Sequence, residues 1–153
     1  MRIFRKSGGQ AGVTLIELAV VMAIVGIMAL FMAPAIGEWL DNYRIRQTAR
    51  DIASTLQLAK MQAISTQTQR SVTFDTINNT YQIQGGNQIK TPKRVFIPNT
   101  DFDATGDAVR FNTNGTSSST SSTAGIYINN LKGKQYRVII GPSGHISMQE
   151  GWT

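Results

Sequence analysis

The residues from 18 to 37 contain no charged side chain, and extending this run back to Val13 adds one charge, that of Glu17. At about 1.5 Å per helical residue, residues 13–36 span the roughly 30 Å hydrocarbon core of a bilayer. Three positive residues precede the run: Arg2, Arg5 and Lys6. Because positive residues tend to stay in the cytoplasm, the sequence predicts a single membrane-spanning helix with a cytoplasmic N-terminus.

Two ordinary interpretations compete with a specialised one for this run. A cleaved secretory signal is one, because Ala33, Pro34 and Ala35 form a small-x-small site, but the run exceeds the usual 7 to 15 residues. A plain single-span anchor is the other. Both leave unexplained why Glu17 lies in an otherwise apolar segment.

The motif Gly12-Val13-Thr14-Leu15-Ile16-Glu17-Leu18 resembles the processing site of type IV prepilins and pseudopilins. The resemblance implies that residues 1–12 are a basic leader, and that a membrane-embedded aspartyl prepilin peptidase cleaves between Gly12 and Val13. The same enzyme would N-methylate Val13. Phenylalanine or methionine is commoner at this position in the family, so Val13 is a mild departure.

Glu17 has a physical argument of its own. A carboxylate in hydrocarbon costs on the order of 2 to 3 kcal/mol unless it is neutralised or paired, and a shallow position near the headgroups would lower that cost. After cleavage, the amine of Val13 on a neighbouring subunit is the expected cation. Pro34 removes a backbone hydrogen bond, so a kink near residues 30–34 is expected, and the resemblance implies an assembly role there.

Beyond residue 37 the pattern becomes amphipathic. Apolar residues recur at helical spacing, and they predict a buried face: Ile45, Ala49, Ile52, Leu56, Ala59 and Ala63. We expect a membrane and assembly half at 13–37 and an amphipathic half at 38–66, within one helix from near Thr14 to about Ser65.

Residues 67–153 alternate short β-like runs with turns, which predicts a β-rich head. The expected strands are 71–74, 81–84, 94–97, 109–112, 126–129, 136–140 and 145–148. No crossover helices are available, so the strands should be antiparallel. The predicted class is therefore α+β: a long N-terminal helix packed against a C-terminal antiparallel sheet, as in the pilin fold.

Further stretches resemble the GspH/FimT family of minor pilins and pseudopilins: residues 53–64, 71–74, 111–116 and 140–144. This resemblance implies a structural subunit of a type IV pilus or of a type II secretion pseudopilus. Its partners would be the prepilin peptidase, other pilins and, before assembly, the membrane. The expected location is the bacterial inner membrane with the head in the periplasm, and then the fibre.

The net charge of +6 permits a second hypothesis, DNA capture. The candidate cations form two groups: Lys132, Lys134 and Arg137, and Lys90, Lys93 and Arg94. DNA-binding FimT-like members carry Gly-Arg-x-Arg near the C-terminus, whereas this chain has Gly144-His145-Ile146-Ser147. That departure weighs against DNA binding.

Enzymatic activity is a third class, with little to support it. The chain has no cysteine, one histidine, no phosphate-binding loop and no His-Glu-x-x-His pair, so we expect no catalytic residues and no cofactor. Asp101, Asp103 and Asp107 lack the downstream ligands of a calcium loop, so we expect no metal either. The sequence does not distinguish between pilus, competence and secretion machines.

Overall fold

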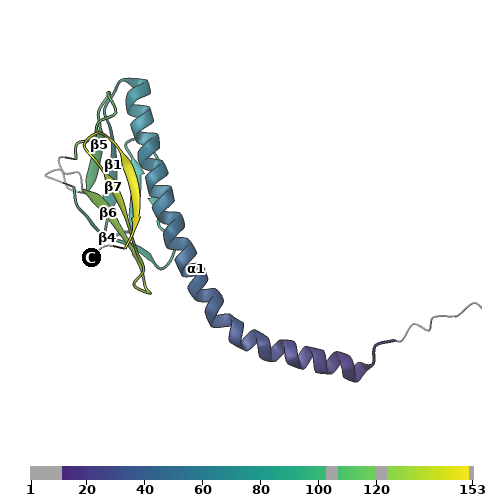
Figure 1. Ribbon diagram of the computed structural model, residues 1–153. Coiled ribbons are helices and arrows are strands. Elements are labelled where there is room, and N and C mark those ends of the chain that lie inside the picture. The colour runs from purple at the N-terminus through teal and green to yellow at the C-terminus, as the bar shows by residue number, and fades with distance from the viewer. Residues whose placement is uncertain (1–11, 103–106, 120–123, 152–153) are drawn as a thin grey trace, which may run out of the picture. The chain divides into compact units, whose positions relative to one another are not determined.

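The structure is a computed structural model that describes residues 12–102, 107–119 and 124–151 (Figure 1). The chain divides into two compact units, with the boundary between Gly37 and Glu38. The helix α1, Leu15–Thr66, contributes to both units. Each unit is described by itself below.

In the first unit, the described helical side chains are exposed and almost all apolar. Leu15 is 87% exposed and Phe31 is 78% exposed, which is the opposite of what a water-facing helix requires. No single described helix is long and apolar enough to cross a membrane. Taken together, Leu15–Phe31 and Ile36–Thr66 are long and apolar enough, but the pair is bent at a break between them. The side chain of Pro34 lies outside the described part, so the expected kink stays a prediction.

In the second unit, α1 buries the face that the sequence predicted. All six predicted residues have no exposed surface: Ile45, Ala49, Ile52, Leu56, Ala59 and Ala63. Burying a side chain the size of isoleucine or leucine stabilises a fold by roughly 1.5 to 3 kcal/mol. The three alanines keep the helix close to the strands, and the larger residues fill the space between.

The strands form two four-stranded antiparallel sheets. The first contains β1 (Arg70–Asp75), β2 (Thr80–Ile83), β3 (Ile89–Lys90) and β5 (Ala108–Phe111), in the order β3-β2-β1-β5. The second contains β4 (Val95–Thr100), β6 (Gly125–Asn130), β7 (Gln135–Ile140) and β8 (Ile146–Glu150), in the order β4-β6-β7-β8. The sequence located every strand except β3, which has two exposed residues and so no alternation.

Both sheets contribute to one core against α1. Alternate residues of β1, β5, β6 and β7 are buried, as one-sided packing requires. Val72, Phe111 and Ile128 are among the core residues that share a cluster with the buried helix face. The predicted pilin-like arrangement of a helix on antiparallel strands is confirmed, with the strands divided between two sheets.

Two glycine turns, one after β5 and one after β7, meet beside α1. The Ser117 N–H donates to the Pro142 carbonyl (3.0 Å), and the Ser117 hydroxyl donates to the Gly141 carbonyl (2.9 Å). The Lys60 ammonium of α1 donates to the Gly144 carbonyl (2.9 Å). The turns therefore join the two sheets to each other and to the helix. Both belong to the stretches that carried the family resemblance.

Gly144 should be irreplaceable at this junction. Its φ is +72°, and an added Cβ would lie 2.0 Å from the Gly115 carbonyl oxygen. We predict that Gly144→Ala destabilises the second unit by roughly 3 kcal/mol or more, from backbone strain plus the clash. Denaturant unfolding of the detergent-solubilised chain, followed by near-UV circular dichroism, measures this effect.

Gly133 provides the matched control, because its φ is +78° but no atom lies within 4 Å of an added Cβ. Gly133→Ala should cost only the strain of the left-handed conformation, about 1 kcal/mol. Equal effects of the two substitutions would show that the contact with Gly115 is unimportant.

Candidate processing and assembly site

The first turn of α1 is closed by a reciprocal pair of hydrogen bonds. The Glu17 N–H donates to the Thr14 hydroxyl (3.3 Å), and the Thr14 N–H donates to a Glu17 carboxylate oxygen (3.4 Å). This is a capping box, in which an N-cap threonine and a glutamate three residues later satisfy otherwise unpaired donors. The helix consequently begins at Leu15.

The predicted cleavage bond lies just outside this cap. Gly12 and Val13 precede the helix and are exposed, Val13 by 75%. A bond in non-helical, exposed chain can enter a protease active site without prior unwinding. The rest of the predicted leader, residues 1–11, lies outside the described residues.

Thr14 is a residue that the sequence reasoning missed. The Thr-x-x-Glu spacing was present in the sequence and is the ordinary signature of a capping box. The sequence by itself assigns Glu17 a role in assembly alone. In the structure the same carboxylate also holds the end of the helix, so the two roles of Glu17 need to be separated by experiment.

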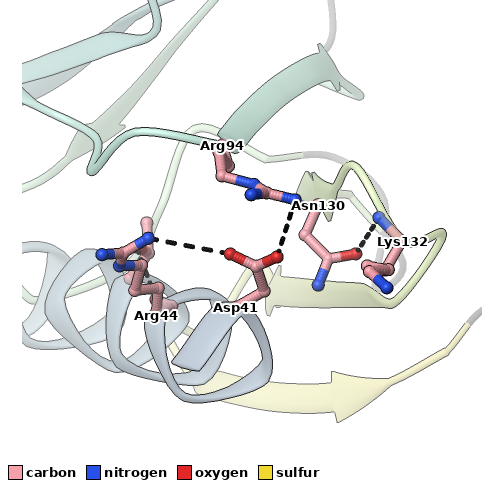
Figure 2. Close-up of polar contacts among 6 residues, drawn as sticks. Asp41, Arg44, Arg94, Asn130 and Lys132 are labelled. Carbon is pink, nitrogen blue, oxygen red and sulfur yellow. Dashed lines mark hydrogen bonds and ion pairs between the residues drawn. The ribbon is translucent and has the colours of Figure 1, made fainter. Parts of the chain in front are cut away.

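At the N-terminal end of the second unit, Asp41 is a buried carboxylate with two cationic partners. Its side chain is 4% exposed; one oxygen lies 3.0 Å from Arg94 and the other 3.7 Å from Arg44 (Figure 2). A buried charge is tolerated when it is paired in this way. Since Arg94 precedes β4, the pair fastens the β3–β4 connection to α1.

Arg94 has an unusual backbone, with a φ of +73°. The left-handed region is unfavourable for a residue with a Cβ by roughly 1 to 2 kcal/mol. The ion pair with Asp41 offsets that strain. Arg94, a candidate for DNA contact in the sequence, therefore has a structural task.

Lys134, another candidate cation, also has an acidic partner. Its ammonium lies 2.7 Å from the Glu150 carboxylate. Its hydrogen bond to Glu150 raises the Lys134 pKa, and the bonds from Lys134 and then Tyr136 lower the Glu150 pKa. The pair is thus lost as pH falls through the lowered pKa of Glu150, or rises through the raised pKa of Lys134.

Arg137, a third candidate cation, also has partners: it lies 3.6 Å from Asp101 and 4.8 Å from the centre of the Tyr127 ring, in a cation–π contact.

The other three candidate cations are exposed: Lys90, Lys93 and Lys132. Lys93 and Lys132 come from different sequence groups, yet their segments are adjacent because Val95 of β4 pairs with Asn130 of β6.

Comparisons with known proteins test the family assignment. Residues 48–144 match the family described as type II transport protein GspH, and residues 8–33 match the prokaryotic N-terminal methylation motif. The first match covers more than half of the chain. The chain belongs to the GspH family. This confirms the family that was indicated by the N-terminal motif together with residues 53–64, 71–74, 111–116 and 140–144.

A solved structure resembles the GspH-family chain: the minor pseudopilin EpsH from the type 2 secretion system of Vibrio cholerae. The identity is 13%, the TM-score is 0.58, and the match covers 70% of this chain and 97% of that one. At this identity the likeness shows a shared fold. A comparison with curated proteins gave no match.

The family assignment is to structural subunits, in agreement with the preferred reading of the sequence. The comparisons give no support to DNA binding. Three of the six candidate cations are also paired with carboxylates: Arg94, Lys134 and Arg137. His145, which stands where a DNA-binding relative would have arginine, is exposed beside Lys60 and Met61 of α1.

Within the described residues, no three acidic or histidine side chains gather as metal ligands. Of the three aspartates that could suggest a calcium loop, Asp103 lies outside the described residues. Asp101 pairs with Arg137, and Asp107 accepts a hydrogen bond from Thr100 (2.6 Å). The two described aspartates therefore already have partners of their own.

The ion pair at Asp41 should be asymmetric in its effect on stability. Arg94→Ala leaves a buried carboxylate with only Arg44 at 3.7 Å, so we predict destabilisation by about 1 to 3 kcal/mol. Asp41→Asn should cost less, because the freed Arg94 side chain is 48% exposed and can be hydrated. Denaturant unfolding of the full chain measures both.

Lys93→Ala is the control for this comparison, since Lys93 is an exposed neighbouring cation with no ion pair among the described residues. Its effect should stay within about 0.5 kcal/mol. A larger effect of Asp41→Asn than of Arg94→Ala would contradict the role of Arg94 as the partner that the buried carboxylate needs.

Proposed function

We propose that this GspH-family chain is a minor subunit of a type II secretion pseudopilus or of a type IV pilus. A prepilin peptidase cleaves between Gly12 and Val13 and N-methylates Val13. Residues 13–37 hold the subunit in the inner membrane, with its N-terminus in the cytoplasm and its head in the periplasm, until they pack with the helices of other subunits.

The observation that carries this proposal is the exposed apolar helix of the first unit, joined to a folded GspH-type head. Residues 15–31 supply a nearly continuous apolar surface that the described part of the chain does not cover. Such a surface needs lipid or other apolar helices as its surroundings. A fibre of packed subunit helices supplies the second environment after the bilayer has supplied the first.

Glu17 is the residue that links processing to assembly. In the single chain its carboxylate accepts a hydrogen bond from the Thr14 N–H. Cleavage creates a cationic amine at Val13, and in the fibre the amine of a neighbouring subunit offers the carboxylate a partner of opposite charge. An ion pair in an apolar environment is stronger than in water and fixes the register between helices.

Substitutions can separate the charge of Glu17 from its capping role. Glu17→Gln keeps an oxygen that can accept from the Thr14 N–H but removes the charge, whereas Thr14→Val removes the hydroxyl cap and keeps the charge. We expect Glu17→Gln and Glu17→Ala to be inserted and cleaved normally yet to be absent from sheared fibres. Thr14→Val should still be incorporated.

Immunoblotting of membrane and sheared-fibre fractions, with leader cleavage read from the mobility shift, measures these outcomes. Normal incorporation of Glu17→Gln would disprove the charge pairing. Loss of cleavage in Thr14→Val, with Glu17→Gln unaffected, would instead assign the cap to presentation of the Gly12–Val13 bond. A chain that is not cleaved at all in a strain with active peptidase would overturn the proposed function.

A further inference from the structure

The N-terminal end of the second unit carries exposed aromatic and apolar side chains next to cations. Trp39 and Tyr43 stack at 5.7 Å between ring centres, and they are 65% and 54% exposed. They line one shallow pocket with Arg46 and Lys134. The first turns of the second unit's helix therefore present rings and charge together.

Two other segments reach the same end of the unit. The 91–94 connection is held there by the Arg94–Asp41 pair, and the β6–β7 turn lies beside it because Val95 pairs with Asn130 (Figure 2). At the tip of that turn, Leu131 is 63% exposed and Lys132 follows it. We call this surface the collar: Trp39, Tyr43, Arg46, Lys93, Leu131 and Lys132.

The collar has cationic charge available to bind a ligand. Lys93 and Lys132 form no ion pair within the described residues, and Arg46 acts on Glu150 only through its charge, without an ion pair. The acidic groups nearby are mostly occupied: Asp41 by two arginines and Glu150 by Lys134. Glu38 is the exposed exception. The surface is therefore suited to an anionic partner.

The sequence position of the collar points to the kind of anion. Trp39 follows the apolar segment that ends at Gly37 by two residues, so chain connectivity keeps it close to any membrane that this segment spans. Tryptophan and tyrosine are enriched where a bilayer meets water, and juxtamembrane Lys and Arg bind anionic headgroups. The exposed Leu131 next to Lys132 also favours a lipid surface over a phosphate backbone.

We propose that the collar binds the anionic headgroup layer of the membrane before assembly and holds the head against the bilayer. The proposal rests on the proposed function, because it requires residues 13–37 to be inserted. Leaving the membrane for the fibre would then require release of these headgroup contacts, and so the collar would oppose premature extraction of the subunit.

The chain has no cysteine, so single cysteines can report the contact. We would label Leu131→Cys with a fluorophore, reconstitute the full chain in vesicles of phosphatidylcholine with or without phosphatidylglycerol, and measure quenching by headgroup-labelled lipid. Thr113→Cys, in the exposed turn after β5, is the control position. Quenching at 131 should exceed that at 113 by at least about twofold with phosphatidylglycerol present.

The excess should fall, without being abolished, when phosphatidylglycerol is left out, or near 1 M salt, where the Debye length is about 3 Å. Lys93→Gln with Lys132→Gln should reduce it. Arg50→Gln with Arg110→Gln removes the same charge from exposed positions elsewhere and should leave it unchanged. Quenching that ignores lipid charge, or that falls equally in both double variants, would overturn the proposal.

Co-flotation of the chain with vesicles after an alkaline wash distinguishes failure of the proposed membrane anchoring from failure of the collar proposal alone. A chain that does not insert overturns the anchoring in the proposed function and this inference with it. A chain that inserts normally but shows equal quenching at positions 131 and 113 overturns only the collar. If the Lys93 and Lys132 substitutions abolish fibre incorporation while lipid quenching persists unchanged, the cations serve a protein partner and the proposal is wrong.

Discussion

The structure depends on the change in side-chain pattern along α1. Up to Gly37 the helix is apolar with one carboxylate, and beyond it the apolar residues retreat to one face. The apolar half of the helix has no polar face to turn towards water, so it requires lipid or other helices around it. The second pattern requires a single surface to cover one face, and the eight strands provide it. The proposed move from bilayer to fibre, with the head staying folded, needs both.

Closure of the head follows from the second pattern. The buried face of α1 belongs to one core cluster to which both sheets contribute. The glycine turns and Lys60 join the sheets where α1 ends, and the Asp41–Arg94 pair fastens the β3–β4 connection where the head helix begins. Polar contacts thus secure the two ends of an interface whose middle is apolar.

Charges at the two proposed functional surfaces would act differently. Glu17 lies in an apolar segment, so its carboxylate gains most from a partner of opposite charge, and in the proposed function that pairing controls when helices associate. The cations of the collar are exposed, so each contributes little alone and they would act together on a charged surface. Glu17 was found from the family resemblance of the N-terminal motif, whereas only the folded unit brings the collar residues together.

The sequence by itself determined the elements, because periodicity reports the environment of each side chain. It located α1, its buried face, seven strands and the processing motif, and these needed only local spacing. It did not find β3, whose two residues show no alternation, or the division into two sheets, which depends on pairing between distant strands. It also placed Arg94, Lys134 and Arg137 among the candidate DNA contacts, and it could not show whether they have acidic partners. Only the tertiary structure decided that carboxylates from α1, β8 and the segment after β4 pair with them, since charge pairing depends on distance in space.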